Sequence, residues 1–458
     1  RAGAPDIKVI HIKGRGYEDP VSGDPMCFKS DVAKKVSSQG LPVQETLCKS
    51  KEPGDDGQYQ VCSHFGSCPY QKQFHDTGPA IRIMAHAYLP LNRHEGHPKP
   101  DLVIVDERFQ DTAVAVKHFQ LGSIVRHRKA TVQVNITRDP DDKLLSGSKM
   151  RGLSETVHNA LASRSPIAQA ITDAGYTSDE VKQAAITELM DMNDRPIDPS
   201  MSDDEQLNRL AVYRRNDTLS LNRMWRLIHE EMTQDNDSPA KGVRDDGVGN
   251  SIGNGQVYRV WLESRPDYIE TDDGNWEETI RDDVYMSWRK TVRISDVPTL
   301  LIDADLDVGI AGKFIPELKT VDIPAPRNAH VVQIGDTSRS IRSLMSFYGA
   351  SDAEVKRAAN RLEDTRNMIR REAWKGRKVL VVAPKKIRME LTGEKPFSDN
   401  NKLPLSGSFE RNDDVQIIHF NALRGIDRFK DFDTVVVICR NQPPVNAVES
   451  TARALWWN

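Results

Sequence analysis

Residues 102–106, LVIVD, form an apolar run that passes directly into two acids, Asp106 and Glu107. Four consecutive Leu, Val and Ile residues predict a strand that is buried on both faces of a parallel sheet. Open α/β sheets bind their ligands beyond the carboxyl ends of their strands. The segment therefore predicts an α/β fold and places two candidate functional carboxylates at the edge of its sheet.

Other strand signals are distributed along the chain. Apolar runs predict strands at 6–13 and at the start of 80–91, where a short helix or turn follows. The second half predicts one helix and a larger set of strands, with the helix at 351–373 and the strands at 297–307, 330–336, 378–384, 415–420 and 434–439. Strands that alternate with helices are typical of a parallel sheet.

Between these two groups of strands, residues 148–233 have helical periodicity. The sequences TSDE at 177–180 and SDAE at 351–354 are capping boxes that predict helix starts. Residues 235–255 are rich in Asp, Asn and Gly, and are expected to form a mobile connection.

The length of 458 residues allows two to four domains. No apolar run approaches the roughly 18 residues of a membrane span, and the start does not resemble a signal peptide, so a soluble cytoplasmic protein without membrane contact is expected. The net charge of −4 provides no general attraction to nucleic acid. The basic run at 356–388 and the acidic runs at 191–206 and 235–283 are interpreted as solvated helix faces.

The cysteines are unevenly distributed. Cys439 lies in the apolar run TVVVIC and is interpreted as a core residue. The other four lie within 42 residues of one another, in polar sequence rich in turn formers: Cys27, Cys48, Cys62 and Cys68. Because disulfides are rare in cytosolic proteins, this cluster predicts metal binding.

The spacing of the four cysteines bears on the kind of metal site. Zinc sites commonly use paired C-x₂₋₄-C knuckles, whereas the gaps here are 20, 13 and 5 residues. A Cys₄ iron–sulfur cluster is therefore favoured, with zinc and unliganded thiols as alternatives. His64 and His75 could complete a zinc site but are interpreted as solvated, and the aromatic residues Phe65, Tyr70 and Phe74 as packing residues.

A phosphate-binding loop of the form G-x-x-x-x-G-K-[ST] does not occur in the sequence. The nearest match, GIAGKF at 309–314, has a different spacing and lacks a hydroxyl after Lys313. The chain opens on Arg1 close to a predicted strand and ends within the predicted helix ESTARALWWN. The sequence is therefore expected to be the middle part of a longer protein.

The order of these features resembles the iron–sulfur superfamily 2 DNA helicases of the XPD and DinG type. A strand and glycine turn, four cysteines, a strand ending in Asp-Glu, a helical block and a second α/β part follow one another. The resemblance implies an α/β fold with two RecA-like parallel-sheet lobes, and with a cysteine-cluster insertion and an arch-like helical insertion in the first lobe. The implied parts are the first lobe at 1–130 with the cysteine insertion at about 20–78, the arch-like insertion at 131–290, a return to the first lobe at 291–325 and the second lobe at 326–458.

In the first lobe the resemblance assigns roles to individual residues. VIHIKGRG matches the first nucleic-acid-contacting motif, so Gly14 and Arg15 are candidates for strand contact. The four cysteines take the positions of the ligands of a 4Fe-4S cluster. VIVDERF matches the DEAH box, which makes Asp106 the Mg²⁺ ligand and Glu107 the base that orients water. Arg108 and Phe109 replace the Ala-His of that motif.

In the second lobe ALRGIDRF resembles a motif that approaches the nucleotide. It makes Gly425 and Asp427 candidates for ATP contact and Arg424 a candidate for nucleic-acid contact. ESTARALW aligns with Q-x-x-G-R-x-x-R, so Arg453 would be an arginine finger. Three positions of that motif differ from the family pattern, Glu449, Ala452 and Trp456.

The resemblance implies an ATP-dependent DNA helicase or translocase that acts in replication or repair. Hydrolysis of Mg-ATP between two lobes would move a single strand and unwind single-stranded or forked DNA, once an upstream phosphate loop is supplied. One alternative is a viral DNA-packaging motor, which would need a nuclease-type cluster of acids in its second half, with Asp303 and Asp305 as the candidates. The other alternative is a non-catalytic module that is stabilised by a bound metal and binds nucleic acid or a protein partner.

Overall fold

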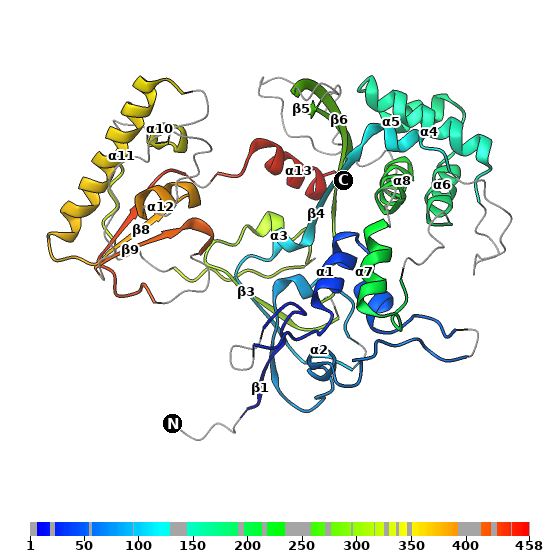
Figure 1. The fold of residues 1–458 in the computed structure, drawn as a ribbon, viewed down its shortest axis with the longest axis horizontal. Coiled ribbons are helices and arrows are strands. Elements are labelled where there is room, and N and C mark those ends of the chain that lie inside the picture. Colours follow the sequence, from blue (N-terminus) through cyan, green and yellow to red (C-terminus); the bar gives the residue numbers. More distant parts are fainter. Residues whose placement is uncertain are drawn as a thin grey trace. The chain divides into compact units, whose positions relative to one another are not determined.

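The computed structural model is a mixed α/β structure with parallel sheets (Figure 1). It divides into two compact units, unit 1 with residues 1–321 and 446–458, and unit 2 with residues 322–445. The last 13 residues, which the sequence assigned to a second lobe, thus group with the first unit. The structure describes residues 7–18, 23–54, 57–94, 96–128, 144–190, 197–212, 218–233, 258–270, 276–294, 296–315, 317–324, 329–335, 339–345, 350–392, 414–422, 428–440 and 442–457.

The cysteine-bearing part of unit 1 begins with a parallel pair of strands. β1 (Val9–His11) pairs with β2 (Ile81–Ile83), which confirms strands within 6–13 and 80–91. The short 3₁₀ turn η2 (His86–Tyr88) follows β2, as expected. Three short helical elements lie between the two strands: α1 (Ser30–Ser38), the π-helical turn η1 (Gln44–Cys48) and α2 (Pro69–Lys72).

A second parallel pair carries the acids. β3 (Val103–Asp106) pairs with β7 (Thr299–Ile302), which confirms the strands predicted there. The expectation that β3 is buried on both faces is wrong, because Val105 is buried but Ile104 is 57% exposed. The reason is that, among the described residues, this sheet has two strands and is not joined to β1 and β2. The short helices α3 (Gln110–Ala113) and α9 (Val308–Ala311) follow these strands.

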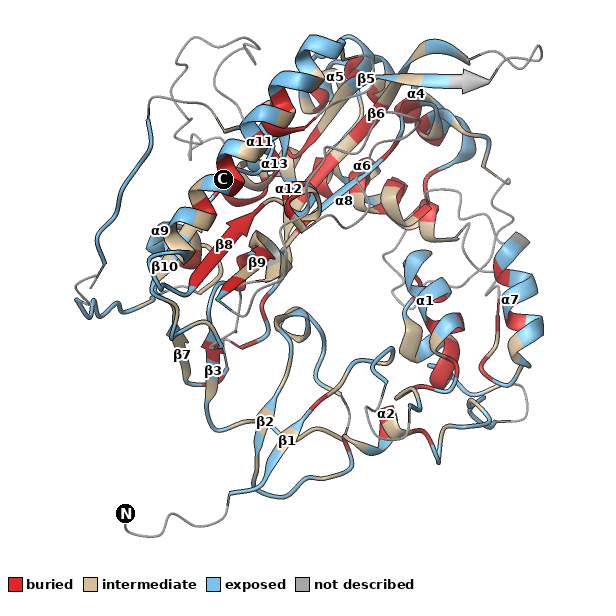
Figure 2. Ribbon diagram, turned by 60° about the vertical axis from the view of Figure 1, so that its left-hand side comes forward, coloured by how far each residue is buried: buried red, intermediate tan, exposed pale blue. Residues whose placement is uncertain are grey.

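The helical block predicted over 148–233 is confirmed. Its helices are α4 (Gly147–Ala162), α5 (Ile167–Asp173), α6 (Ser178–Met190), α7 (Asp203–Val212) and α8 (Thr218–Thr233). The capping box ahead of α6 is present, because the backbone N–H of Thr177 donates to Glu180 and that of Glu180 donates to the Thr177 hydroxyl. α7 packs against α1, and both Figure 1 and Figure 2 draw the two helices side by side.

The sequence did not predict the antiparallel sheet on which this helical block packs. Its order is β4 (Val114–Gln120), β6 (Trp276–Arg289) and β5 (Val260–Glu270), so the interpretation of 235–283 as solvated helix faces is wrong for its second half. The buried Val284 and Met286 alternate along β6. The intervening charges hide this pattern, and one of them, Asp283, is buried against Arg265 and Arg281.

Unit 2 is built on the parallel sheet β10–β8–β9. Its elements are α10 (Ile341–Leu344), α11 (Asp352–Ala373), β8 (Val379–Ala383), α12 (Lys385–Thr392), β9 (Val415–His419) and β10 (Thr434–Val437). β8 is buried along its whole length, as the central strand of such a sheet should be (Figure 2). The capping box at Ser351 and Glu354 is also present.

One predicted strand in unit 2 is wrong. Residues 330–335 form neither strand nor helix, and Val331 and Val332 are 74% and 73% exposed. An apolar run becomes a strand only where a neighbouring strand pairs with it, and this segment has none among the described residues.

The connection predicted at 235–255 lies outside the described residues. Among the described helices, none combines the length and the apolar composition that crossing a bilayer requires.

Candidate metal centre and acidic strand ends

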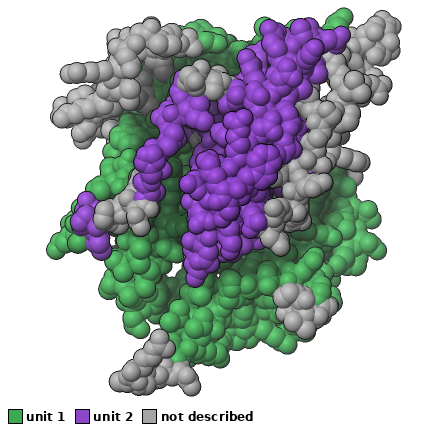
Figure 3. Space-filling view, turned by 90° about the vertical axis from the view of Figure 1, so that its left-hand side faces the viewer, with its two compact units in different colours: residues 1–321, 446–458 green, residues 322–445 purple. Residues whose placement is uncertain are grey.

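The four clustered cysteines line a single pocket in unit 1, the unit coloured green in Figure 3. The pocket has an empty volume of about 280 Å³. Its other lining residues are Phe28, Lys29, Leu47, His64, Phe65 and Gln71. The structure therefore brings together four thiols that are spread over 42 residues of the sequence: Cys27, Cys48, Cys62 and Cys68.

Backbone hydrogen bonds explain why the thiols meet. The N–H of Cys62 donates to the carbonyl of Cys48 at 2.9 Å, next to an antiparallel bridge between Lys49 and Val61. Cys68 precedes Pro69, which begins α2, and Pro is favoured at the first position of a helix. The N–H of Tyr70 then donates to the carbonyl of Met26 at 2.9 Å, which holds the start of α2 beside Cys27.

The cysteine thiols shift one another's pKa values. The hydrogen bond from Cys27 lowers the pKa of Cys68 to about 6, and the nearby Arg15 and two backbone N–H groups act in the same direction against burial. The same hydrogen bond and burial raise the pKa of Cys27. Burial raises the pKa of Cys48, and the charge of Arg15 opposes this effect. The hydrogen bond between Cys27 and Cys68 therefore favours the thiolate of Cys68, the form that binds metals.

The other groups near the cysteines have packing roles. Tyr70 and Phe74 are buried, with their rings edge to face at 5.4 Å, as predicted. His64 and His75 are exposed, in agreement with the solvated interpretation, although His64 lies at the rim of the cysteine pocket. In the described part of the chain, no group of three or more His, Cys, Asp and Glu side chains is arranged to hold a single metal ion directly.

The predicted acids lie at the carboxyl end of the β3–β7 pair. Asp106 is in register with Ile302, and the N–H of Glu107 donates to the carbonyl of Ile302 at 2.8 Å. Asp303 follows Ile302, so carboxylates from both strands meet at one edge. Asp106 and Glu107 are exposed. The carboxylate of Asp303 accepts a hydrogen bond from the N–H of Asp305 at 3.0 Å.

Glu107 has a φ of 62°, in the left-handed region that residues with a Cβ rarely adopt. This conformation costs roughly 1–2 kcal/mol. Arg164, Glu317 and Cys439 also have a positive φ, so the conformation alone does not mark a functional site. The two residues that follow have structural contacts, because Arg108 pairs with Asp111 at 3.2 Å and Phe109 is buried against Phe314. The residue with the left-handed backbone is thus Glu107, whose carboxylate is predicted to orient water.

The sequence did not predict a second pocket, which is open to solvent and is lined by Arg108 but by neither Asp106 nor Glu107. Residues from five segments of unit 1 line it, including Arg108, Gln110, Glu263, Tyr285 and Ile310 and, from α13 (Val445–Leu455), Asn446, Ser450 and Thr451. Gln110 is 5% exposed, and its Oε1 has no hydrogen-bond partner among the described residues. No sequence pattern linked α13 to this pocket, since more than 300 residues separate the helix from Arg108.

Arg453 lies on α13 but is bound to the antiparallel sheet. Its guanidinium lies 4.7 Å from the centre of the Trp261 ring and donates to the carbonyl of Tyr258 at 3.0 Å. Burial lowers its pKa. In this structure Arg453 thus anchors α13 to β5 instead of pointing at Asp106 and Glu107.

Of the remaining predicted site residues, Gly14 is exposed and Arg15 is turned toward Cys48. Arg424, Gly425 and Asp427 lie outside the described residues. Comparisons with protein families, with curated proteins and with solved structures found no match for this chain.

Proposed function

We propose that this chain is part of an iron–sulfur, ATP-dependent DNA helicase or translocase of superfamily 2. The observation that carries the proposal is the meeting of four cysteine thiols in one pocket, with the strand that ends in Asp106 and Glu107 following them in the chain. The proposed ligands of a 4Fe-4S cluster are Cys27, Cys48, Cys62 and Cys68.

The spacing of the cysteines favours a cluster over zinc. Zinc sites commonly use paired C-x₂₋₄-C knuckles, whereas the gaps here are 20, 13 and 5 residues, and four thiolates from irregular loops are also the donor set of an iron–sulfur cluster. When bound, the cluster would fix the loops between β1 and β2.

The acidic strand ends support the ATPase part of the proposal. Asp106 would hold Mg²⁺ and Glu107 would orient the attacking water, since both are exposed at the carboxyl end of a parallel pair. The phosphate-binding loop would come from residues beyond this sequence, and Gly425 and Asp427 would approach the nucleotide. The arginine-finger role of Arg453 stays a prediction, and it requires that the side chain leave Trp261.

Movement of the two lobes with each ATP turnover would carry a single DNA strand. Gly14 and Arg424 remain the proposed strand contacts, and the affinity is expected to depend on salt because it comes from phosphate neutralisation.

The test is the substitution Glu107→Gln in the full-length gene product. It should lower DNA-stimulated ATP hydrolysis by about 100-fold or more, because the carboxylate that orients water is lost, and leave single-strand binding unchanged. The matched control is Glu155→Gln, at an exposed position of α4. Hydrolysis at the wild-type rate would refute the assigned role of Glu107.

The two alternatives predict other results in the same assays. A DNA-packaging motor would also cleave DNA, and Asp303→Asn or Asp305→Asn would abolish that cleavage. A non-catalytic module would bind DNA without hydrolysing ATP.

A further inference from the structure

Arg15 is directed at the cysteine pocket. Its Nη2 donates to the thiol sulfur of Cys48 at 3.6 Å and to Oε1 of Gln44 at 2.8 Å. We propose that Arg15 is a positioning residue that sets the reduction potential of the cluster through its hydrogen bond to Cys48. This inference rests on the proposed function, and it gives Arg15 a role different from the nucleic-acid contact that the sequence predicted.

A chain of hydrogen bonds holds the guanidinium in place. Oε1 of Gln44 also accepts from Nε2 of Gln71 at 3.1 Å, and Oε1 of Gln71 lies 3.1 Å from Nε2 of His94. The His94 ring in turn stacks on Phe74, with ring centres 4.1 Å apart. Gln71 is 2% exposed and lines the cysteine pocket. Arg15 is therefore fixed by groups whose own positions are fixed by packing.

The ring of Tyr70 forms one wall around the guanidinium. The central carbon of Arg15 lies 3.9 Å from the centre of that ring, within the range of a cation–π interaction. The Nε of Arg15 is buried and has no hydrogen-bond partner among the described residues. The contact with the thiol is made by Nη2, and Nε makes no competing hydrogen bond among the described residues.

Arg15 and Lys29 are two cations near the cysteines, and of the two only Lys29 pairs with a carboxylate among the described residues. Lys29 lines the same pocket, but its ammonium lies 2.9 Å from the carboxylate of Asp203 and donates to Met201 and Gln206. No carboxylate pairs with Arg15 in the described part of the chain, and its acceptors are an amide and a thiol. A charge without a counterion exerts more of its field on the neighbouring sulfur.

This arrangement has a defined effect on electron uptake. Reduction adds one electron from an external reductant to the oxidised cluster, without breaking a bond, and makes the site more negative by one charge. A positive hydrogen-bond donor on a ligand sulfur stabilises the more negative form, because net charge and hydrogen bonds to sulfur set the potentials of such clusters. Arg15 should therefore raise the reduction potential.

The experiment compares midpoint potentials in redox titrations followed by electron paramagnetic resonance. Arg15→Gln should hold the same iron and sulfide as the wild type but have a more negative potential. Arg15→Lys should lie between the two, since an ammonium keeps the charge but its nitrogen lies one bond nearer the backbone than Nη2, which donates to both Gln44 and Cys48. The control Lys34→Gln, on the exposed face of α1, should leave the potential unchanged.

An unchanged potential in a fully loaded Arg15→Gln protein would overturn the inference and leave the proposed function intact. If Arg15→Gln does not fold, Arg15→Lys decides, and a wild-type potential in that variant overturns the inference. A wild-type protein without iron would instead refute the proposed function itself.

Discussion

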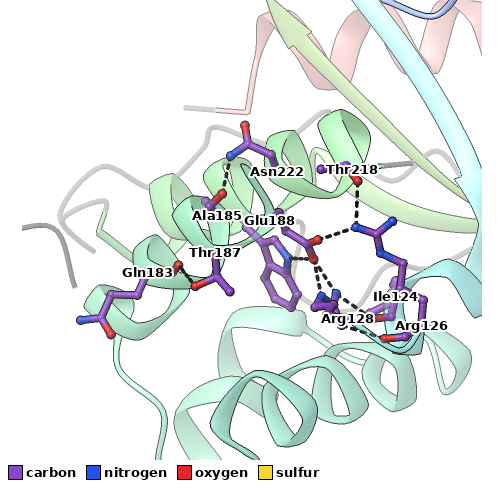
Figure 4. Close-up of polar contacts among 10 residues, drawn as sticks. Ile124, Arg126, Arg128, Gln183, Ala185, Thr187, Glu188, Thr218 and Asn222 are labelled. Atoms are coloured by element: carbon purple, nitrogen blue, oxygen red, sulfur yellow. Dashed lines mark hydrogen bonds and ion pairs between the residues drawn. The ribbon is translucent and has the colours of Figure 1, made fainter. Parts of the chain in front are cut away.

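The carboxylate of Glu188, which is fully buried, accepts two hydrogen bonds from Arg128, from Nε at 3.0 Å and from Nη2 at 2.5 Å (Figure 4). Arg126 donates to the other carboxylate oxygen, Oε2, at 2.9 Å. The indole N–H of Trp225 donates at 3.1 Å to Oε1, the oxygen that Arg128 contacts. The network joins α6 and α8 to the segment that follows β4. Two arginines thus share one buried carboxylate.

Glu188→Ala should lower the free energy of unfolding by roughly 3–5 kcal/mol, because it leaves two largely buried guanidinium groups without their partner. Thermal or urea unfolding measures the change. The control is Glu155→Ala, at an exposed position of α4. A loss below about 1 kcal/mol, the range of an exposed pair, would show that the network does not hold the helices together.

The parts of the fold that the sequence could predict are those in which local pattern and final environment agree. The capping boxes at Ser351 and Thr177 are local hydrogen-bond arrangements, so their four-residue signatures were sufficient. The run at 379–383 is apolar at every position and became a fully buried central strand. The pattern of that run agrees with its final environment, because β9 and β10 pair with it on both sides and leave no exposed edge or face.

The antiparallel sheet and the second pocket depend on distant partners. Asp283 lies in a charged stretch that favours an exposed surface, yet it is buried because Arg265 and Arg281 pair with it. The cysteine cluster was found because the thiols are rare and close in sequence, whereas the contact of Arg15 with Cys48 joins residues 33 positions apart and has no sequence signature. Arg453 likewise matched a motif, but its position is decided by Trp261.

The left-handed backbone of Glu107 predicts a difference in stability between two substitutions that both remove its carboxylate. Glu107→Gly should raise the stability by about 1 kcal/mol relative to Glu107→Ala, because glycine alone accepts a φ of 62° without a steric penalty. Both variants lack the carboxylate and should lack ATP hydrolysis. Paired unfolding curves measure the difference, and equal stabilities would mean that the position is not strained.

Glu231 predicts a pH dependence of stability. Burial raises its pKa to about 7, against the opposing effect of Arg259, whereas the unfolded chain has the ordinary value near 4.5. The folded state therefore binds the proton more tightly, and this stabilisation is complete below about pH 4.5 and lost as the pH rises through 7. Its full size is on the order of 3 kcal/mol.

Glu231→Gln removes this titration. The variant should be more stable than the wild type at pH 8, and the difference should shrink as the pH falls to 5.5. Unfolding curves at both values measure it, with the exposed Glu205→Gln of α7 as a control that should show no such trend. A difference that is the same at the two pH values would exclude a raised pKa for Glu231.

The metal content of the protein tests the central claim most directly. Protein purified without oxygen should contain close to four iron and four sulfide ions per chain and absorb near 400 nm, and Cys48→Ser should reduce both the content and the absorbance. One zinc ion per chain without iron, or thiols that all react freely with no metal bound, would contradict the account.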